Sequence, residues 1–224
     1  SNKFENAVTF ATASALVRTI ATWIPATRQV LDDFDGLEGF IRTSLIYAVR
    51  KEEEDQLLSG DNTGQNLNGL ITQAQAFNTA LLIASDGWEK VDIIGRAIQQ
   101  IAAADEESPD FVVLHPTDYW GIRLTKDSQG RYIFGNPDEA GPVRFFGLTP
   151  IITGAITAAS FLVGSSAPNV AVIRDRMDLT VEISTEHSDY FIKNMVAIRA
   201  EERLALVVFR PNAAVTGSLN TSPV

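Results

Sequence analysis

The sequence contains no cysteine and only two histidines among its 224 residues. Without cysteine the chain has neither disulfide bonds nor a thiolate metal site, so a reducing compartment is its simplest setting. His115 and His187 lie far apart in the sequence and form no HxxH-type pair. The sequence therefore offers none of the usual zinc-binding patterns.

Basic residues and long hydrophobic runs are also scarce. Lysine and arginine number 18 against 28 acidic residues, which gives a net charge of -10, and this balance argues against a broad phosphate-binding face. The most apolar stretch, residues 147–164, contains Pro150, threonines and glycines. It predicts a strand, a turn and a second strand rather than a membrane span. The amino end, "SNKFENAV", is polar and charged, unlike a signal peptide.

The loop "GDNTGQNLNG", residues 60–69, lacks the features of a binding loop. No lysine followed by serine or threonine comes after its last glycine, as a phosphate loop requires. Counted from Asp61, the sixth and twelfth positions hold Asn66 and Thr72, where a calcium loop needs glycine and glutamate. The composition instead favours an ordinary glycine/asparagine turn.

The candidate catalytic side chains are better explained by structural roles. His115 precedes Pro116 at the end of an expected strand, which favours a hydrogen-bonding histidine over a general base. The serines at 160, 165 and 166 lack a nucleophile-elbow pattern. Glu201 and Glu202 are neighbours on an expected strand, so they point to opposite faces and form no dyad. Catalysis on a small molecule has little support, although a soluble hydrolase remains the alternative from another class.

One long helix is expected over residues 36–59. Asp35 can cap it, Glu38 completes a capping-box pattern, and Gly60 is the natural stop. At ~1.5 Å per residue such a helix spans roughly 36 Å. Its apolar stripe is formed by Leu37, Ile41, Leu45 and Ala48. Four acids, residues 52–55, fall near its carboxyl end, where the helix dipole disfavours negative charge.

The remaining chain predicts an α+β class, with a long helix beside long strands. The run from Phe191 to Phe209 alternates, with a mostly apolar face that includes Asn194 and Glu202 and a charged face that includes Arg199 and Glu201. Charged faces on an elongated plate are usually solvated, but they can also meet complementary neighbours in an assembly. The other expected elements are an extended segment over 1–31, a helix over 86–104 buried through Val91, Ile94, Ala97, Ile98 and Ile101, a buried strand over 110–116, a short helix over 116–127 opened by Thr117 or Asp118, and a hairpin over 128–137.

Four blocks of sequence carry a resemblance to a known family. They read "VRTIATWIPATRQVLDD", "EEEDQLLSGDNTGQNLNGL", "LTKDSQGRYIFGNP" and "DRMDLTVEISTEHSDYFIKNMVAIRAEERLALVVFRP". In this order they resemble the major capsid protein of tailed bacteriophages of the Hong Kong 97 type, from about residue 8 to the end of the chain. A resemblance of this extent is far more specific than any single motif.

The resemblance implies a capsid fold with four named parts. Residues 1–27 are similar to the return arm of the extended loop. Residues 28–60 and 173–207 are similar to the peripheral domain, which contains the long spine helix and the long strands. Residues 61–172 and 208–224 are similar to the axial domain. The chain would then start partway through the extended loop, as a fragment, a processed form or a chain lacking its early part.

The resemblance also implies what the chain does and with what. The family self-assembles through pentamers and hexamers into icosahedral shells that enclose double-stranded DNA without sequence-specific binding. Portal, scaffold, protease and decoration proteins are the further partners, with no membrane and no cofactor or metal. The location would be the virion capsid, assembled in the cytoplasm of the bacterial host. The runner-up among shell proteins is a bacterial nanocompartment.

One family member joins its subunits covalently, and the matching positions here are Lys3, Asn194 and Glu201. In that chemistry a lysine amine attacks an asparagine side chain on another subunit, and a glutamate accepts the proton. Met177 keeps the pocket methionine of the family. Arg199 stands where the family has an apolar residue, and a permanent charge opposes the desolvation that a neutral amine requires.

The acidic run at 52–55 carries a further hypothesis. In a tiled shell, these acids would pair with arginines of the same or an adjacent subunit, and Arg199, Arg203 and Arg210 are the candidates. A solvated acidic turn is the alternative. The acidic balance of the whole chain also fits a container from which DNA must slide freely, because lysine and arginine contacts to phosphate would oppose that movement.

Overall fold

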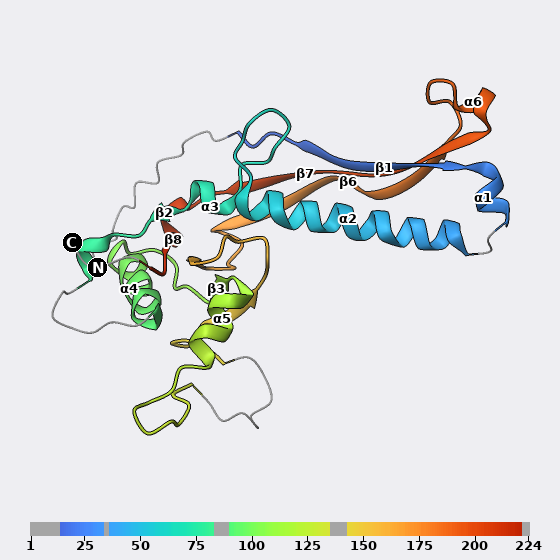
Figure 1. Ribbon diagram of the computed structural model, residues 1–224. Coiled ribbons are helices and arrows are strands. Elements are labelled where there is room, and N and C mark those ends of the chain that lie inside the picture. Colours follow the sequence, from blue (N-terminus) through green and yellow to red (C-terminus); the bar gives the residue numbers. More distant parts are fainter. Residues whose placement is uncertain (1–13, 34–35, 83–89, 135–142, 221–224) are drawn as a thin grey trace.

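The computed structural model describes residues 14–33, 36–82, 90–134 and 143–220. These residues form an elongated arm attached to a lobe that contains a second sheet (Figure 1). In the arm, helix α2 (Leu37–Ser59) runs alongside three strands. They are β1 (Arg18–Thr27), β6 (Ala171–Ser184) and β7 (Met195–Val208). The elongated arrangement of one long helix beside long strands, which the sequence predicts, is confirmed.

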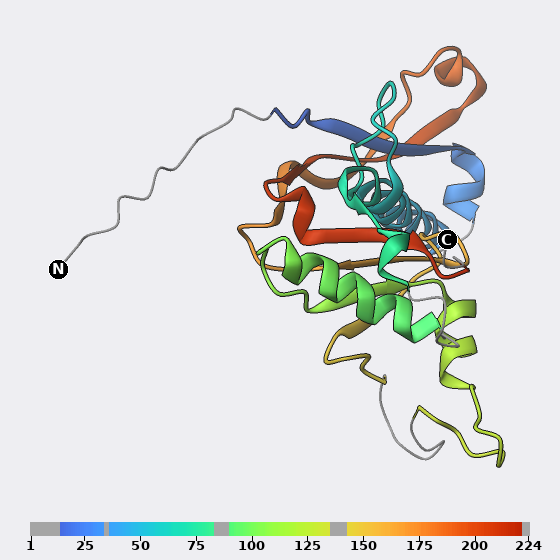
Figure 2. The ribbon, with the colours of Figure 1, turned by 90° about the vertical axis from the view of Figure 1, so that its left-hand side faces the viewer.

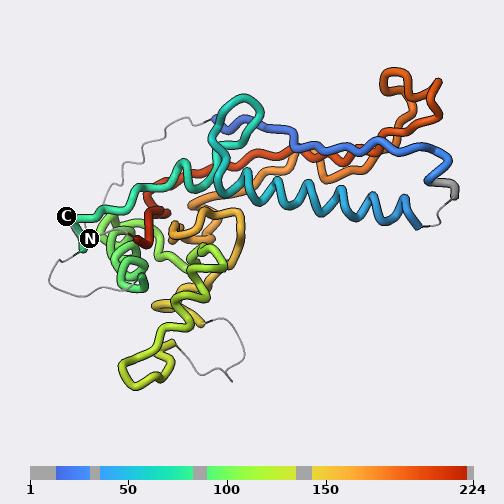
Figure 3. Tube along the Cα trace, in the orientation of Figure 1, coloured from blue at the N-terminus to red at the C-terminus, as the bar shows by residue number. Residues whose placement is uncertain are grey.

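The sheet of the arm has the order β1-β7-β6, and both neighbours are antiparallel to β7. Side chains of β7 alternate as the sequence predicts: Ile198, Ala200 and Leu204 are buried, whereas Arg199 and Arg203 are exposed. The buried side chains pack against Leu45 and Val49 of α2. This helix-on-sheet contact is the core of the arm, and the helix and the strands of the arm lie side by side along its length (Figure 3).

The start of α2 differs from the expected capping box. Gly36, with φ +88°, is the N-cap residue and provides no side-chain cap. Glu38 Oε1 instead accepts from Arg42 Nε at 2.8 Å, one helical turn along. Asp35, the expected cap, lies outside the described residues. The expected stop at Gly60 is confirmed, because its backbone N–H donates to Gln56 at 3.0 Å.

Two short helices replace parts of the expected strands at the far end of the arm. Residues 28–31, expected as extended, belong to α1 (Arg28–Asp33). The alternating run begins at Met195, because Phe191 and Ile192 lie in α6 (Tyr190–Lys193). Asn194 ends α6 in a left-handed conformation with φ 53°. The strand predicted from the alternation therefore starts four residues too early, at Phe191 instead of Met195.

The lobe contains a five-stranded sheet in the order β2-β8-β5-β3-β4. Residues 147–164 give two strands, as predicted, but these strands do not pair with each other: β3 lies between them, parallel to β4 and antiparallel to β5. No helix among the described residues is both long and apolar enough to cross a membrane. The strands are β2 (Gln75–Ala76), β3 (Phe111–Leu114), β4 (Thr149–Ile152), β5 (Ser160–Gly164) and β8 (Ala214–Ser218).

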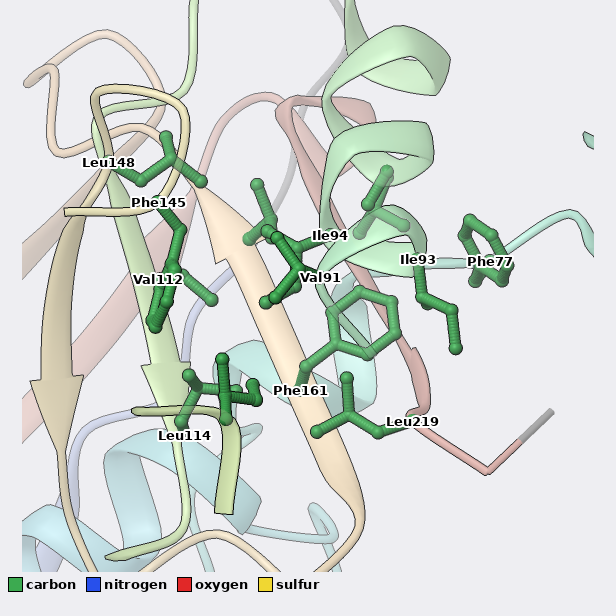
Figure 4. Close-up of a cluster of buried hydrophobic side chains, with 14 of the residues drawn as sticks. Phe77, Val91, Ile93, Ile94, Val112, Leu114, Phe145, Leu148, Phe161 and Leu219 are labelled. Carbon is green, nitrogen blue, oxygen red and sulfur yellow. The ribbon is translucent and has the colours of Figure 1, made fainter. Parts of the chain in front are cut away.

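Helix α4 (Lys90–Ala103) lies across one face of this sheet (Figure 2). Its side chains Val91 and Ile94 are directed at the strands that carry Val112 and Phe161 (Figure 4). The predicted apolar face is confirmed at positions 91, 94, 97 and 101, with Ile98 partly buried and Ile93 also buried. Residues 83–89 are outside the described residues, so only the part of the expected 86–104 helix from Lys90 onward is observed.

The opposite face of the sheet joins the lobe to the arm. Val113 and Leu162 on this face pack with Leu58 near the end of α2 and with Leu70 on α3 (Leu70–Gln73). Adjacent residues of β3 thus pack in different hydrophobic clusters, since Val112 faces α4 and Val113 faces α2. The C-terminal end of α2 is therefore fixed to both sheets.

The remaining elements connect these parts. Helix α5 (Pro116–Arg123) begins after His115, whose Nδ1 accepts from the backbone N–H of Thr117 at 3.3 Å. The N-cap is thus His115 and not Thr117 or Asp118. The hairpin expected at 128–137 is reduced, within the described residues, to a bridge between Lys126 and Tyr132. The described residues also form two 3-10 helices, η1 (Thr79–Leu81) and η2 (Pro211–Ala213).

Candidate assembly and crosslinking sites

The far end of the arm exposes large apolar side chains. Phe191 and Ile192 on α6 are 84% and 86% exposed, whereas the following strand, β7, buries alternate side chains. Beside them, the ring of His187 lies 5.2 Å from Trp23 and 5.0 Å from Tyr190. Exposed apolar groups gathered in one place indicate a contact surface. We call this surface, formed by Trp23, Tyr190, Phe191 and Ile192, the tip patch.

The tip turn is held by polar contacts within it. Lys193 Nζ lies 2.5 Å from Asp189 Oδ2. The hydrogen bond from Lys193, with its positive charge, lowers the pKa of Asp189, and the same contact raises the pKa of Lys193. Both groups are at the surface, so the pair orders the turn but adds little stability. The short helix α6 thereby presents Phe191 and Ile192 outward.

Asn194, the predicted crosslink acceptor, lies next to the tip patch with its side chain exposed. Its backbone carbonyl accepts from the N–H of Arg28 at 3.0 Å, which fixes the turn between α6 and β7. A left-handed conformation is tolerated by asparagine better than by most residues. The side-chain amide is thus available to a group from outside the chain.

Glu201, the predicted base, lies within β7 and is not brought near Asn194 by the fold. Arg199 Nη1 approaches Glu201 Oε2 at 3.2 Å, and Arg199 Nη2 approaches Glu182 Oε2 at 2.9 Å. The guanidinium predicted to disturb the pocket therefore pairs with the predicted base in the single chain. Met177 lies on β6, paired with Arg203 of β7. Lys3, the predicted attacking amine, lies outside the described residues.

The acidic run does not pair with the arginines named for it within this chain. Arg199 binds Glu182 and Glu201, and Arg210 Nη1 lies 3.2 Å from Glu106. Arg203 makes no ion pair with the run in the described part of the chain. The same-subunit version of the hypothesis is therefore wrong, and pairing with an adjacent subunit stays a prediction. The run also lies within α2 and not at its last residue, because the helix continues to Ser59.

The loop after α2 is an internal cap on the helix end. Asp61 accepts from Thr63 and from Asn66, and these hydrogen bonds lower its pKa to about 2. Gln56 reaches the loop from α2: its Oε1 accepts from the backbone N–H of Leu67 at 3.0 Å. The polar groups of the loop are used to bind the helix end, and the described residues contain no group of three or more histidines or acids placed to hold a metal ion.

Helix α2 also exposes two aromatic side chains, apart from the tip patch. Phe40 and Tyr47 are 70% and 71% exposed, and their spacing of seven residues places them on one face of the helix.

A groove of about 700 Å³ lies between α2 and the lobe, and Leu57, Leu58, Val113, Ile151 and Ile173 line it. Sequence reasoning missed these surfaces, because exposure of an apolar side chain depends on the tertiary packing.

Sequence and fold comparisons identify the family. The Phage capsid family profile matches residues 2–219. The chain is also 43% identical, over 219 residues, to the major capsid protein of Enterobacteria phage HK97. This chain belongs to the phage capsid family. The alignment covers 98% of the chain and 56% of that relative, so the chain spans little more than half of its length.

Solved capsids share the fold of this phage capsid family chain. The capsid of the empty GTA particle has a TM-score of 0.72 at 19% identity, over 96% of this chain and 79% of that one. Gordonia phage Cozz has a TM-score of 0.72 at 14% identity, over 97% of this chain and 77% of that one. The expected Hong Kong 97-type α+β fold is thereby confirmed. Neither the nanocompartment nor the hydrolase alternative is favoured by these similarities.

Proposed function

We propose that this chain is the major head protein of a tailed phage or prophage, which assembles through pentamers and hexamers into an icosahedral shell around double-stranded DNA. The observation that carries the proposal is family membership over residues 2–219 together with the capsid fold. Assembly would take place in the host cytoplasm, and portal, scaffold, protease and decoration proteins would be the further partners. The domain division given above, with an extended-loop arm, a peripheral domain and an axial domain, belongs to the same proposal.

The surface of the single chain supports assembly. The tip patch and the Phe40–Tyr47 pair expose aromatic and aliphatic groups that the chain does not bury by itself. Within the described residues, both sheets also end in edge strands without a further partner, β6 in the arm and β4 in the lobe. Soluble monomers usually protect long strand edges and rarely gather large exposed apolar side chains in one place. Contact with further copies would cover them.

Expression of the intact protein in bacteria, followed by sedimentation and negative-stain electron microscopy, tests this proposal. Closed shells, or rings with five or six subunits, are expected. A protein that stays monomeric at all accessible concentrations, also in the presence of its own scaffold and protease, would contradict it. Lys3→Arg is a useful additional sample, because it removes the attacking amine of the crosslink described next and should leave shell formation intact.

Crosslinking of subunits is the finer part of the proposal. The Nζ atom of Lys3 of one chain would attack the side-chain carbonyl carbon of Asn194 of another. A C–N bond forms, ammonia leaves with the former amide nitrogen, and Glu201 of a third chain accepts the proton of the amine. The exposed side chain of Asn194 supports this role. The ion pair between Arg199 and Glu201 opposes it, because Arg199 competes for the oxygen that would accept the proton.

A denaturing gel of assembled shells tests the crosslink. If it forms, ladders of covalent oligomers appear, and each bond lowers the mass by one ammonia. Lys3→Arg should abolish the ladders, since a guanidinium stays protonated and does not attack. Lys193→Arg is the matched control, because Lys193 adjoins Asn194 but is paired with Asp189. Monomer-sized bands alone from wild-type shells would remove the crosslink and leave the shell proposal intact.

A further inference from the structure

Two glutamates face each other inside the contact between α2 and the sheet of the arm. On α2, Leu45, Val49 and Leu57 belong to the cluster that packs on β7, and Glu53 falls on the same series at four-residue spacing. On β7, Ile198, Ala200 and Leu204 form the buried row, and Glu202 falls on the same row at two-residue spacing. Each glutamate therefore occupies a position that is otherwise apolar.

Glu202 is the more buried of the two glutamates. Its residue is 7% exposed, and its Oε1 has no hydrogen-bond partner. A buried carboxylate without a partner is costly, so such a group either binds a cation or keeps its proton. No salt bridge within the described residues reaches Glu202. The structure thus favours a protonated carboxyl at this position.

The strand opposite Glu202 is irregular. Strand β6 pairs Met177 with Arg203 and Thr180 with Glu201, so a bulge in β6 lies across from Glu202. On the other side, Ile20 of β1 pairs with Glu202. Bulges bend a strand and re-aim its side chains. A second irregularity of β6 lies between Asp175 and Met177, and Asp175, which pairs with Leu204, is within electrostatic reach of both glutamates.

The charges around the pair are mostly negative. Burial, then the negative charges of Glu53 and Asp175, raise the pKa of Glu202 to about 7, while Arg50 on α2 acts in the opposite direction. Burial and Asp175 also raise the pKa of Glu53, and Arg50 again opposes. Strand β1 adds Arg18, two residues from Ile20, which does not contribute to either shift. Helix α3, which also packs on β7, carries no titratable side chain.

We infer that Glu53 and Glu202 form a proton-dependent joint that sets how tightly the long helix packs on the sheet of the arm. With a proton on the pair, one carboxyl can donate to the other and the contact closes. Without it, two carboxylates and Asp175 repel one another across the interface, and α2 loosens from β7 near its C-terminal half. The joint is independent of the proposed shell, since it lies within one chain.

The direction of the pH effect follows from the raised pKa of Glu202. The folded arm binds this proton more tightly than the unfolded chain, so the stabilisation is fully present below pH 4.5, the ordinary value. It is lost as the pH rises through about 7. One extra bound proton changes the unfolding equilibrium constant by at most about tenfold per pH unit within this interval.

Native-state hydrogen exchange of the intact protein tests the joint. Amides of β7 and of the second half of α2 are followed across this pH interval, and amides of α4 in the lobe correct for the intrinsic pH dependence of exchange. In the wild type, the opening equilibrium constant of the arm amides, divided by that of the lobe amides, should increase several-fold as the pH rises. Equal opening of the arm and the lobe at every pH would overturn the inference.

Matched variants keep the test specific. Glu202→Gln and the milder Glu53→Gln retain the side-chain shape, remove one charge and should flatten the pH dependence. Glu54→Gln changes the neighbouring exposed acid of α2 and should behave as the wild type. If Glu54→Gln flattens the response as much as Glu53→Gln, the effect is one of general charge and the joint is wrong. If Glu202→Gln fails to fold, Glu53→Gln alone decides.

Discussion

Lys90 Nζ of α4 lies 2.7 Å from Asp118 Oδ1 of α5, and the Asp118 residue is only 4% exposed. The other carboxylate oxygen of Asp118 accepts from the backbone N–H of Ala159, before β5. One carboxylate therefore connects three separate segments of the lobe. Removing it leaves a partly buried cation and a partly buried N–H without their partner.

We accordingly expect Asp118→Ala to destabilise the lobe by about 3 kcal/mol. Chemical denaturation followed by circular dichroism measures the change. Glu38→Ala is the control, because it breaks only the exposed pair with Arg42 and should cost less than about 0.5 kcal/mol. Equal effects of the two variants would show that Asp118 does not hold these segments together.

Gly60, where α2 meets its capping loop, leaves no room for a side chain. A Cβ there would lie 2.3 Å from the carbonyl oxygen of Leu67 and 2.5 Å from that of Gln56. We expect Gly60→Ala to separate the loop from the helix end and to cost about 1–3 kcal/mol, the usual range for overpacking. Gly154→Ala, with no atom within 4 Å of its Cβ, should be near neutral. Thermal melting of both variants compares them.

The core of the arm should be sensitive to cavities. Leu45 is 1% exposed and packs in the cluster that holds α2 against β7. Truncation of Leu45→Ala should cost about 2–5 kcal/mol, since the surrounding backbone relaxes only in part. Hydrogen exchange is the measurement of choice, because it shows where protection is lost. Loss confined to α2 and β7 is expected, whereas uniform loss in α4 as well would indicate that arm and lobe unfold as one unit.

The tip patch should matter for assembly and not for folding. Phe191→Ser combined with Ile192→Ser removes two side chains that the single chain leaves more than 80% exposed. Stability should therefore change by less than about 0.5 kcal/mol, while the yield of shells or rings should fall at least several-fold. Glu186→Ser, exposed on the same hairpin, is the control. Unchanged assembly of the double variant would exclude the patch as a contact.

The acidic run on α2 gives a prediction that only an assembly can test. Glu54 is exposed and makes no salt bridge in the described part of the chain. If an adjacent subunit supplies an arginine, Glu54→Lys should weaken assembly and alter its salt dependence, because exposed ion pairs are screened by salt. Asp178→Lys, an exposed reversal on β6, serves as control. Light scattering over a salt series follows assembly, and identical curves for wild type and Glu54→Lys would remove the pairing.

Much of the fold could be predicted because its signals are local. The period of α2, the stop at Gly60 and the alternation of β7 each follow from neighbouring residues. The tip turn was missed because tertiary contacts, such as the bond from Arg28 to Asn194, override the strand propensity of residues 191–194. The predicted capping box is not formed, since Gly36 is the N-cap by its backbone conformation and Glu38 bonds to Arg42 instead.

The candidate sites, like the fold, were predictable from the sequence only in part. Family resemblance predicts Asn194 and Glu201 as crosslinking residues, and the fold exposes the first and pairs the second with Arg199. The positions of Glu53 and Glu202 in the contact between α2 and β7 could be predicted in principle, because both lie on buried series that their neighbours define. The periodicity of the sequence does not show which face of α2 packs on which row of β7. Only this tertiary packing places the two carboxyls opposite each other.

A cryo-electron microscopy reconstruction of the particles formed by the intact protein tests the central claim, that copies of this chain tile into a closed shell. The claim predicts five- and six-subunit rings in which the arm of each copy contacts its neighbours and the tip patch is covered. Particles without icosahedral order, or a shell in which Phe191 and Ile192 remain as exposed as in the single chain, would contradict it.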